Sequence, residues 1–358
     1  MKVVARTHHL WTLALLLATL LAAPVATQQK GGVDLHGSYD VVAGWMKPYA
    51  GQENLVSPVT VFAENADRVF IGSLGITPKA SAPPTLTTFD PKVPGAKVEH
   101  PLVVVNRNGE VIERWTQWYG RFGSIHTVTM DPYDAEKHVW VIDRVSQQVM
   151  KFTNDGARLV MALGEQGIAG TDEKHFGRPS GIAFLPDGSF YVSDGYDNRR
   201  VIKFAKDGRY LTQWGKQGSA PGEFGLPHSV SLDAGGRVYV ADRMNDRVQV
   251  FDGNGKPLDQ WPAFNNPSRV FITQDQFAWV SDARSNKFAK FDLNGRLLAT
   301  FGTGGRFPGG MAAPHDFSVD PDGNLYVANP WNFTVDKYVP RQGADRSRLV
   351  GQRYKANP

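Results

Sequence analysis

Three of the nine histidines in this sequence recur at one position of a repeated pattern. The repeat is a short alternating strand, a polar turn, a second strand that ends in Val-x-Asp, and a polar loop. When the copies are aligned on the aromatic residue of the second strand, the residue eleven places earlier is, in chain order, Val59, Ser180, His228, Ser268 and His315. In the second copy a longer turn brings His126 to this position, fourteen places before Trp140. Copies two, four and six therefore carry histidine, and the other three do not.

This alternation would place three imidazoles around one point if the copies surround a common axis. Three histidines and a water are the usual ligand set of a catalytic zinc ion with an open position. The sequence therefore predicts a zinc site of His126, His228 and His315. The alternative is that each histidine is an ordinary core or turn residue. Strict alternation at a single repeat position favours the metal site.

The elements that would hold these histidines form six copies of a four-strand unit. Turns of the Asp-Pro-Asp-Gly type separate first and second strands, as in Asp320-Pro-Asp-Gly323. Six four-stranded units predict an all-β, six-bladed β-propeller, in which the first strand of each blade lines a central channel. The predicted second strands are Val69–Ser73, Val139–Asp143, Phe190–Asp194, Val238–Asp242, Ala278–Asp282 and Leu325–Asn329.

The two ends of the repeat array complement each other. The sixth copy lacks an obvious fourth strand after Val339, and Tyr39–Trp45 reads as a fourth strand without a partner. We expect this strand to join the last blade and close the ring, which removes exposed sheet edges. The expected organisation is a signal peptide at 1–26, a linker at 27–38, the propeller at 39–340 and a C-terminal tail at 341–358.

The first residues have the pattern of an export signal. Lys2 and Arg6 precede an apolar run from Leu10 to Ala23, which is short for a membrane span. We expect a secreted or periplasmic protein, with an uncleaved anchor as the alternative. No other stretch reaches membrane-spanning length, so we expect no span in the mature chain, which should be a monomer.

Composition excludes several classes of chemistry. With no cysteine, the chain has no disulfide, no thiolate nucleophile and no Cys-type zinc site. Its formal charge is +4, and basic and acidic residues alternate along it. Without a basic stripe, we expect no nucleic-acid binding.

Other polar residues should overlook the histidine ring, because loops after the second strands lie at the same rim. These loops contain Arg144, Tyr196, Arg243 and Asp282, and Asp316 directly follows the third histidine. A phenol near a divalent metal can serve as a base, so Tyr196 is a candidate catalytic residue, with surface packing as the alternative. Arg243 has the chemistry to hold a substrate carboxylate, although arginines in such repeat loops are often structural.

The first copy departs from the pattern. Residues Ile76 to Pro101, rich in Pro, Ala, Thr and Lys, separate its second and third strands. We expect a long loop there, either a disordered insertion or a lid over the site.

These motifs carry a family resemblance. The repeats resemble NHL repeats, and residues from about 35 to 340 resemble the lyase domain of peptidylglycine α-amidating enzymes. The matching segments are Ile125-His126, Val192–Tyr196, Leu226-Pro-His228-Ser, Ala241-Asp-Arg243, Pro314-His315-Asp316 and Asn108–Trp115.

The resemblance implies a function and site residues. The implied reaction splits a C-terminal α-hydroxyglycine into a peptide amide and glyoxylate, so the partner would be a peptide C-terminus or a related small molecule. The resemblance also allows a structural calcium ion near the channel, with ligands that are largely backbone. Its implied residues are the three histidines as zinc ligands, Tyr196 as base, and Arg243 and Asp316 as further site residues.

One departure from that family bears on activity. The family has a catalytic arginine at the end of the second strand of blade one, where this chain reads Phe70–Gly75 without arginine. Either Arg144 or Arg269 takes over, or the substrate differs, or the activity is lost. The alternative function is therefore a non-catalytic NHL propeller that binds a peptide, glycan or protein. A calcium-dependent lactonase-type propeller would need acidic and Asn ligands at the ring, where this chain has histidine.

Overall fold

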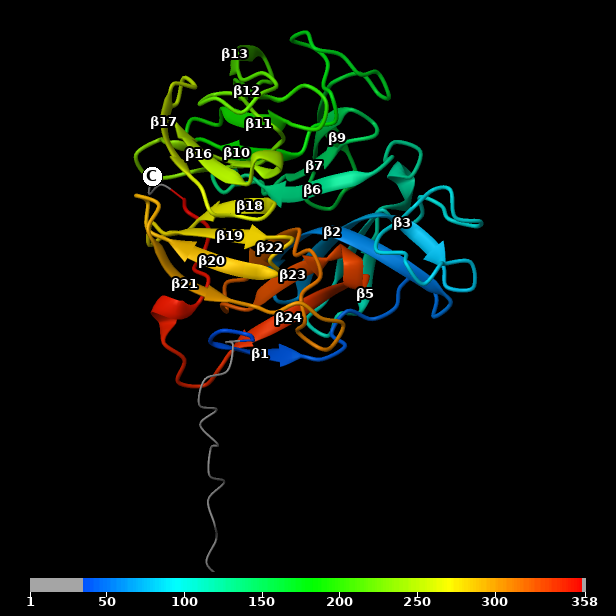
Figure 1. The fold of residues 1–358 in the computed structure, drawn as a ribbon. Helices are drawn as coiled ribbons and strands as arrows, with labels where there is room; N and C mark the ends of the chain where they lie inside the picture. The colour runs from blue at the N-terminus through cyan, green and yellow to red at the C-terminus, as the bar shows by residue number, and fades with distance from the viewer. Residues whose placement is uncertain (1–34, 356–358) are drawn as a thin grey trace, which may run out of the picture. The chain divides into compact units, whose positions relative to one another are not determined.

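The computed structural model describes residues 35–355, which form six four-stranded antiparallel sheets around a channel (Figure 1). The predicted all-β six-bladed propeller is therefore confirmed. The predicted signal segment, residues 1–26, lies outside the described residues. Among the residues that are described, no helix has the length and apolar character needed to cross a membrane.

The blades are numbered in chain order. Blade 1 is β2 (Asn54–Asn65), β3 (Arg68–Pro78), β4 (Leu102–Val105) and β5 (Val111–Arg114), and blade 2 is β6 (Ile125–Met130), β7 (Val139–Asp143), β8 (Gln148–Phe152) and β9 (Leu159–Leu163). Blade 3 is β10 (Gly181–Phe184), β11 (Phe190–Asp194), β12 (Arg200–Phe204) and β13 (Tyr210–Trp214), and blade 4 is β14 (Pro227–Leu232), β15 (Val238–Asp242), β16 (Arg247–Phe251) and β17 (Pro257–Trp261). Blade 5 is β18 (Pro267–Ile272), β19 (Ala278–Asp282), β20 (Lys287–Phe291) and β21 (Leu297–Phe301), and blade 6 is β22 (Asp316–Val319), β23 (Leu325–Asn329), β24 (Thr334–Pro340) and β1 (Tyr39–Val42). Short 3-10 turns are η1 (Thr116–Trp118), η2 (Arg243–Asn245), η3 (Pro330–Asn332) and η4 (Arg346–Arg348).

Blade 6 is built from both ends of the described chain. Strand β1 pairs antiparallel with β24, with Tyr39 opposite Pro340 and Val42 opposite Lys337. The paired segment is shorter than the expected Tyr39–Trp45. Beyond it, Trp45 is buried against Tyr326 of β23, with ring centroids 5.0 Å apart.

Burial explains why inner and outer strands differ in sequence. The inner strands, such as β7 and β11, are buried along their whole length between neighbouring blades and are nearly continuous apolar runs. The fourth strands, such as β9 and β13, alternate between half-buried and exposed residues.

Aromatic side chains join each blade to the next. The tryptophan that ends a fourth strand packs on the third-strand Phe of the following blade, as in Trp214 on Phe251 and Trp261 on Phe291, with ring centroids 5.7 and 5.8 Å apart. Gly255, in the turn that follows the third strand of blade 4, has φ +88°, and a Cβ there would overlap the Trp214 ring. The turn chemistry and the packing between blades therefore both require glycine at this position.

Blade 1 differs from the others in length. Strand β3 runs to Pro78, beyond the predicted end at Ser73, and continues into the region expected to be a loop. Ile76 then exchanges backbone hydrogen bonds with Lys97, so the segment folds back along β3. No residue of 79–101 is among the described residues that line the central cavity.

The C-terminal segment crosses the end of the channel opposite the histidines. The Tyr354 amide donates to the Ile272 carbonyl at the end of β18, and the Gln274 amide donates to the Gln352 carbonyl. Arg353 reaches into the channel, where its Nη1 donates to Thr129 Oγ1 (2.9 Å) and the Met130 carbonyl (3.0 Å). The expected C-terminal tail therefore covers one mouth of the channel.

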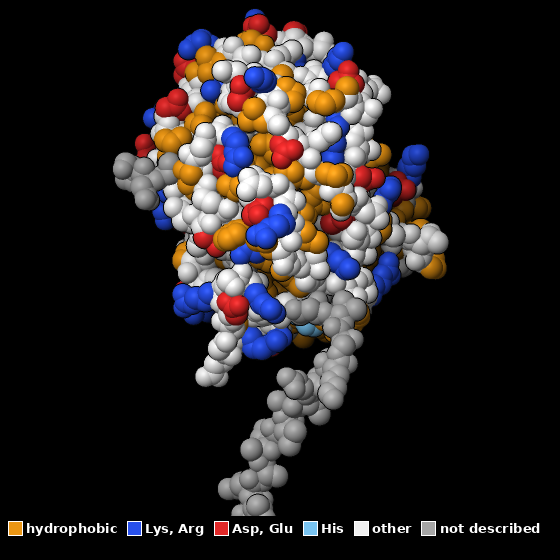
Figure 2. Space-filling view, turned by 60° about the vertical axis from the view of Figure 1, so that its left-hand side comes forward, with side chains coloured by type: hydrophobic (Ala, Val, Ile, Leu, Met, Phe, Trp, Pro, Cys, Tyr) orange, Lys and Arg blue, Asp and Glu red, His pale blue; other side chains and the backbone are white. Residues whose placement is uncertain are grey.

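Charged side chains of both signs are present on the face that Figure 2 shows. On the face in Figure 2, Lys and Arg side chains alternate with Asp and Glu across most of the view. This distribution is in line with the expectation that the chain does not bind nucleic acid, which stays a prediction.

Candidate metal centre

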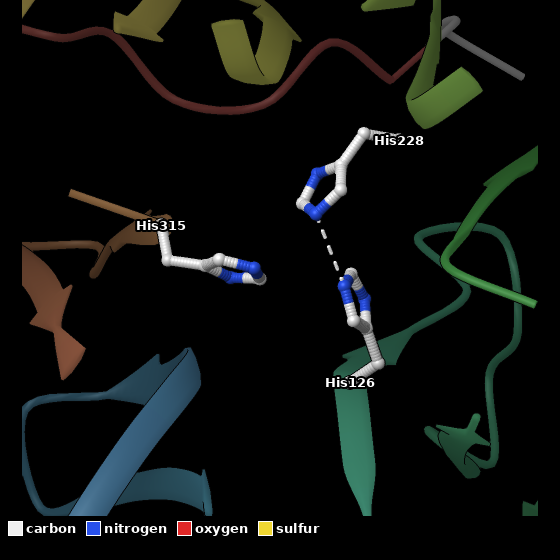
Figure 3. A group of neighbouring side chains, drawn as sticks. All are labelled: His126, His228 and His315. Atoms are coloured by element: carbon white, nitrogen blue, oxygen red, sulfur yellow. Dashed lines mark hydrogen bonds between the residues drawn. The ribbon is translucent and has the colours of Figure 1, made fainter. Parts of the chain in front are cut away.

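The three histidines of the alternating pattern meet at the channel axis. His126 lies in β6, His228 in β14, and His315 directly precedes β22; all three are buried. Their ring centroids are 4.7 to 4.9 Å apart, and one nitrogen from each lies within 4.8 Å of the others. Figure 3 shows the rings pointing toward one another from separate blades.

The blades without histidine hold the rings in place. Each imidazole Nδ1 contacts a backbone carbonyl oxygen, which can only accept a hydrogen bond, so Nδ1 must carry the proton. The Nε2 lone pair then faces the axis. The acceptors are Ser180 for His126 (2.7 Å), Ser268 for His228 (2.6 Å) and Val59 for His315 (2.7 Å).

Burial keeps the three imidazoles neutral. Together with nearby positive groups, among them Arg243, it lowers the pKa of His126 and His228 well below the usual range and the pKa of His315 to about 3. Neutral imidazole is the form that binds metals.

The donor set fits a zinc ion. The Nε2 atoms of His126 and His228 are 3.1 Å apart, and both carry lone pairs when their Nδ1 atoms are protonated. Such convergent lone pairs repel each other, and a cation bound between them would remove this repulsion. Bonds of about 2.0 to 2.1 Å from a tetrahedral zinc ion to imidazole nitrogens would suit this spacing. The cavity beside the rings is about 20 Å³, room for about one water-sized group.

Two predicted site residues lie against the Nε2 atoms. The Tyr196 hydroxyl, in the loop after β11, is 3.0 Å from Nε2 of His126 and 3.2 Å from Nε2 of His228. Arg243 begins η2, and its Nη1 is 3.0 Å from Nε2 of His228. Its Nε donates to Oδ1 of Asn266 at 2.5 Å, which fixes the guanidinium over the ring.

Two further arginines flank the tyrosine. The guanidiniums of Arg144 and Arg178 lie 5.5 and 5.6 Å from the centre of the Tyr196 ring. Arg144 Nε also donates to Ser124 Oγ at 3.1 Å, and its charge lowers the pKa values of His126 and Arg243. This face of the ring therefore presents a positive surface around a phenol.

Asp316 lies one residue deeper in the channel than the histidine ring. Its Oδ2 accepts from Thr60 Oγ1 at 2.5 Å, and its Oδ1 is paired with Nη1 of Arg269. Neither contact is with Tyr196 or Arg243. The structure thus places Asp316 beside His315 along the chain but does not bring its carboxylate to the group around Tyr196.

Asp282 stabilises the loops next to its own strand. Its Oδ2 accepts from the Asn265 amide (2.7 Å) and from Ser285 Oγ (3.0 Å), so it braces the loops around its own strand end. Asp242 does the same in blade 4, where Oδ1 accepts from the Gly225 amide. The structure does not join Asp282 to the histidines.

The sequence did not indicate the three backbone carbonyls that accept hydrogen bonds from the histidines. It also did not indicate Asn266, Thr60 or Arg178 as residues of the site. The acceptor residues were in the alignment as the positions between the histidines. Their side chains, however, give no sign of where a backbone carbonyl points.

Comparison with known proteins places the chain in a family. A family model described as a 6-bladed beta-propeller (DUF5128) matches residues 168–293. NHL repeat-containing protein 3 of Mus musculus is 30% identical over 259 residues, covering 67% of this chain and 72% of that protein. The chain belongs to the NHL-repeat family of six-bladed β-propellers.

Other relatives carry names that refer to amidation. Peptidyl-glycine alpha-amidating monooxygenase B of Xenopus laevis is 31% identical over 232 residues, which are 60% of this chain and 26% of that protein. The chain thus spans about a quarter of that relative's length. A Caenorhabditis elegans protein named "Probable peptidyl-alpha-hydroxyglycine alpha-amidating lyase" is 29% identical, covering 63% of this chain and 66% of that one. These matches show a family relation to the lyase domain.

Solved structures agree on the fold. A streptogramin B lyase is 10% identical and has a TM-score of 0.54, with 84% of this chain and 97% of that chain covered. At this identity the likeness shows the propeller fold alone.

Proposed function

We propose that this protein is a zinc-dependent lyase that acts on C-terminal α-hydroxyglycine or a closely related carbinolamide. The observation that carries the proposal is the convergence of three neutral Nε2 atoms beside Tyr196 and Arg243. The names of the relatives supply the reaction class. Export to the periplasm or the cell exterior is part of the proposal and rests on the predicted signal at 1–26.

In this reaction the bond between the amide nitrogen and the hydroxylated carbon breaks. The hydroxyl loses its proton and becomes the aldehyde of glyoxylate, while the departing nitrogen gains a proton and becomes the primary amide. His126, His228 and His315 would hold a zinc ion, which when bound supplies Lewis-acid polarisation of the substrate oxygen.

The residues of this chain would orient the substrate and move the proton. The Tyr196 hydroxyl lies within 3.2 Å of two Nε2 atoms, so it would face the hydroxyl of a substrate bound there and accept its proton. Arg243, fixed by Asn266, would bind the substrate carboxylate.

Arg144 is the arginine that would replace the one missing from blade 1. It lies on the same face as Tyr196 and Arg243, whereas Arg269 is committed to Asp316 one residue deeper. Asp316 would act as a positioning residue for the strand that carries His315.

The direct test is glyoxylate release by purified, zinc-loaded protein. The substrate is a peptide ending in α-hydroxyglycine, and the matched control is the same peptide ending in glycine. We expect equimolar amide and glyoxylate from the first peptide, none from the second, and loss of activity in metal-free protein. Zinc-loaded, folded protein that releases no glyoxylate above background would contradict the proposal.

A pair of variants tests the assignment of Arg144. Arg144→Gln should raise the KM roughly tenfold or more, because Arg144 would bind the substrate carboxylate together with Arg243 and this charge-assisted hydrogen bond would be lost. Arg178→Gln is the matched control, because this arginine also flanks Tyr196 but is 45% exposed and paired with Asp197. Equal effects of the two substitutions would show that Arg144 has no special part in binding.

A second candidate function is a non-catalytic propeller that binds a peptide, glycan or protein. The absence of arginine from Phe70–Gly75 favours it. So does the human NHL repeat-containing protein 3, which is 39% identical over 229 residues and whose name refers only to its repeats. Under this alternative the protein would bind the hydroxyglycine peptide, or another partner, without turnover.

A further inference from the structure

An ion pair lies in the channel just below the histidine ring. Arg269 of β18 donates through Nη1 to Oδ1 of Asp316, and their side chains are 18% and 5% exposed. The Arg269 guanidinium is also 5.6 Å from the centre of the Phe271 ring and 5.8 Å from that of Phe317. A cation at this position is therefore held by one carboxylate and two aromatic rings.

A second guanidinium fills the channel from the opposite end. Arg353 is bound to Thr129 Oγ1 and to the Met130 carbonyl. Burial and the charge of Arg269 lower the pKa of Arg353 to about 10, although Asp131 and Asp316 act in the opposite direction. The channel thus holds two positive side chains in sequence.

This arrangement does not suit a calcium ion. Calcium takes six to eight oxygen ligands, which can be backbone carbonyls and waters as well as carboxylates, and negatively charged ligands are needed to offset nearby positive charges. Of the described residues that line the two cavities along the channel, Asp316 alone is acidic. One of its oxygens is paired with Arg269 and the other accepts from Thr60. A dication here would also be repelled by both guanidiniums.

We propose that Arg269 is the resident cation of the channel beside Asp316, and that no structural calcium ion binds there. The protein supplies this positive charge itself, so the packing of the first strands does not depend on calcium. Asp316 in turn joins β22 to β18 through Arg269 and to β2 through Thr60. Three blades are linked at the level just below the histidines.

The first experiment measures metal content in the wild-type protein. Protein dialysed against buffer containing both zinc and millimolar calcium, then against metal-free buffer, is analysed for both elements. We expect no bound calcium and no change in Tm when calcium is added. About one calcium per chain, with a rise in Tm, would overturn the proposal whatever the variants show.

The second experiment tests the ion pair through a double-mutant cycle of Arg269→Ala, Asp316→Asn and the combined variant. Removing Arg269 alone leaves a buried carboxylate without a counter-charge, whereas the combined change removes both charges. We expect the unfolding equilibrium constant to show a coupling of roughly tenfold or more between the two positions. If Arg269→Ala does not fold, Arg269→Gln takes its place in the cycle, since it also removes the positive charge but keeps part of the side-chain volume. Independent, additive effects would contradict the assignment.

Discussion

The blades that carry histidine and those that do not contribute to the same centre by different means. Blades 2, 4 and 6 supply imidazole rings, and blades 1, 3 and 5 supply the carbonyl oxygens that orient them. One repeat position thus supplies an imidazole in alternate blades and the carbonyl that orients it in the others. A six-fold scaffold presents a three-fold group of histidines because side chain and backbone alternate around the ring.

The largest expected effect follows from removing a ring from a histidine blade. His228→Ala should lower zinc affinity roughly a hundredfold or more, because two imidazoles cannot provide the ligand set. Isothermal titration with zinc measures this loss. The matched control is His138→Ala, since His138 is buried in blade 2 but bonds to Asp134 away from the ring. Equal losses in both variants would show that the effect arises from folding.

Tyr196 tests whether a blade without histidine also contributes to chemistry. Tyr196→Phe keeps the ring that packs between Arg144 and Arg178 but removes the hydroxyl. We expect kcat for glyoxylate release to fall roughly a hundredfold or more, with zinc content unchanged. Wild-type kcat in this variant would exclude the phenol as the base.

The polar pairs at the ends of the second strands also differ between blades, but not in the alternating order of the histidines. Asp194 pairs with Arg200 in blade 3 and Asp242 with Arg247 in blade 4, but blade 6 has Asn329 bonded to Asp336. Without a counter-charge, burial raises the pKa of Asp336 to about 6.

The raised pKa of Asp336 determines how the stability of the protein changes with pH. The native state holds the Asp336 proton more tightly than the unfolded state, so stability falls as pH rises from about 4 to about 6 and stays lower above. Asp336→Asn should therefore raise the free energy of unfolding near neutral pH by about 1 to 2 kcal/mol, after allowance for its partial exposure, and change little near pH 4. Denaturant unfolding at both pH values measures this. A destabilised variant at neutral pH would contradict the expectation.

The smallest effect is expected at a carbonyl position. Ser268 holds His228 through its backbone oxygen, and its buried hydroxyl has no hydrogen-bond partner. Ser268→Ala should therefore leave zinc affinity within about twofold of the wild-type value. A large loss would show that the side chain, and not the carbonyl, supports the ring.

Much of this architecture can be predicted from the sequence because the same strand and turn pattern recurs in each copy of the repeat. Alternating strands, Asn-Gly and Asp-Gly turns and the Val-x-Asp strand ends indicated six four-stranded units, and register alone brought the histidines to one position. Tyr196 and Arg243 could be predicted because the loops after second strands share the rim of the ring. These features follow from local patterns that repeat.

Other features depend on contacts that the repeat does not encode. The pairing of Asp316 with Arg269 joins blades 6 and 5, and Arg353 enters the channel from a segment outside the repeats. The extension of β3 to Pro78 is formed by pairing with the start of β2, where Asn54 lies opposite Pro78, and Lys97 adds one bridge at Ile76. Every residue type carries the same backbone carbonyl, so the residue types at these positions do not show where it points. The three carbonyl acceptors around the candidate centre therefore could not be predicted from the sequence.

X-ray absorption spectroscopy at the zinc edge of the loaded wild-type protein reports directly on the ligands of the proposed metal centre. We expect one zinc per chain with three imidazole nitrogens at about 2.0 to 2.1 Å and a fourth light-atom ligand. A zinc ion with fewer imidazole ligands, or folded protein that binds no zinc, would contradict this expectation.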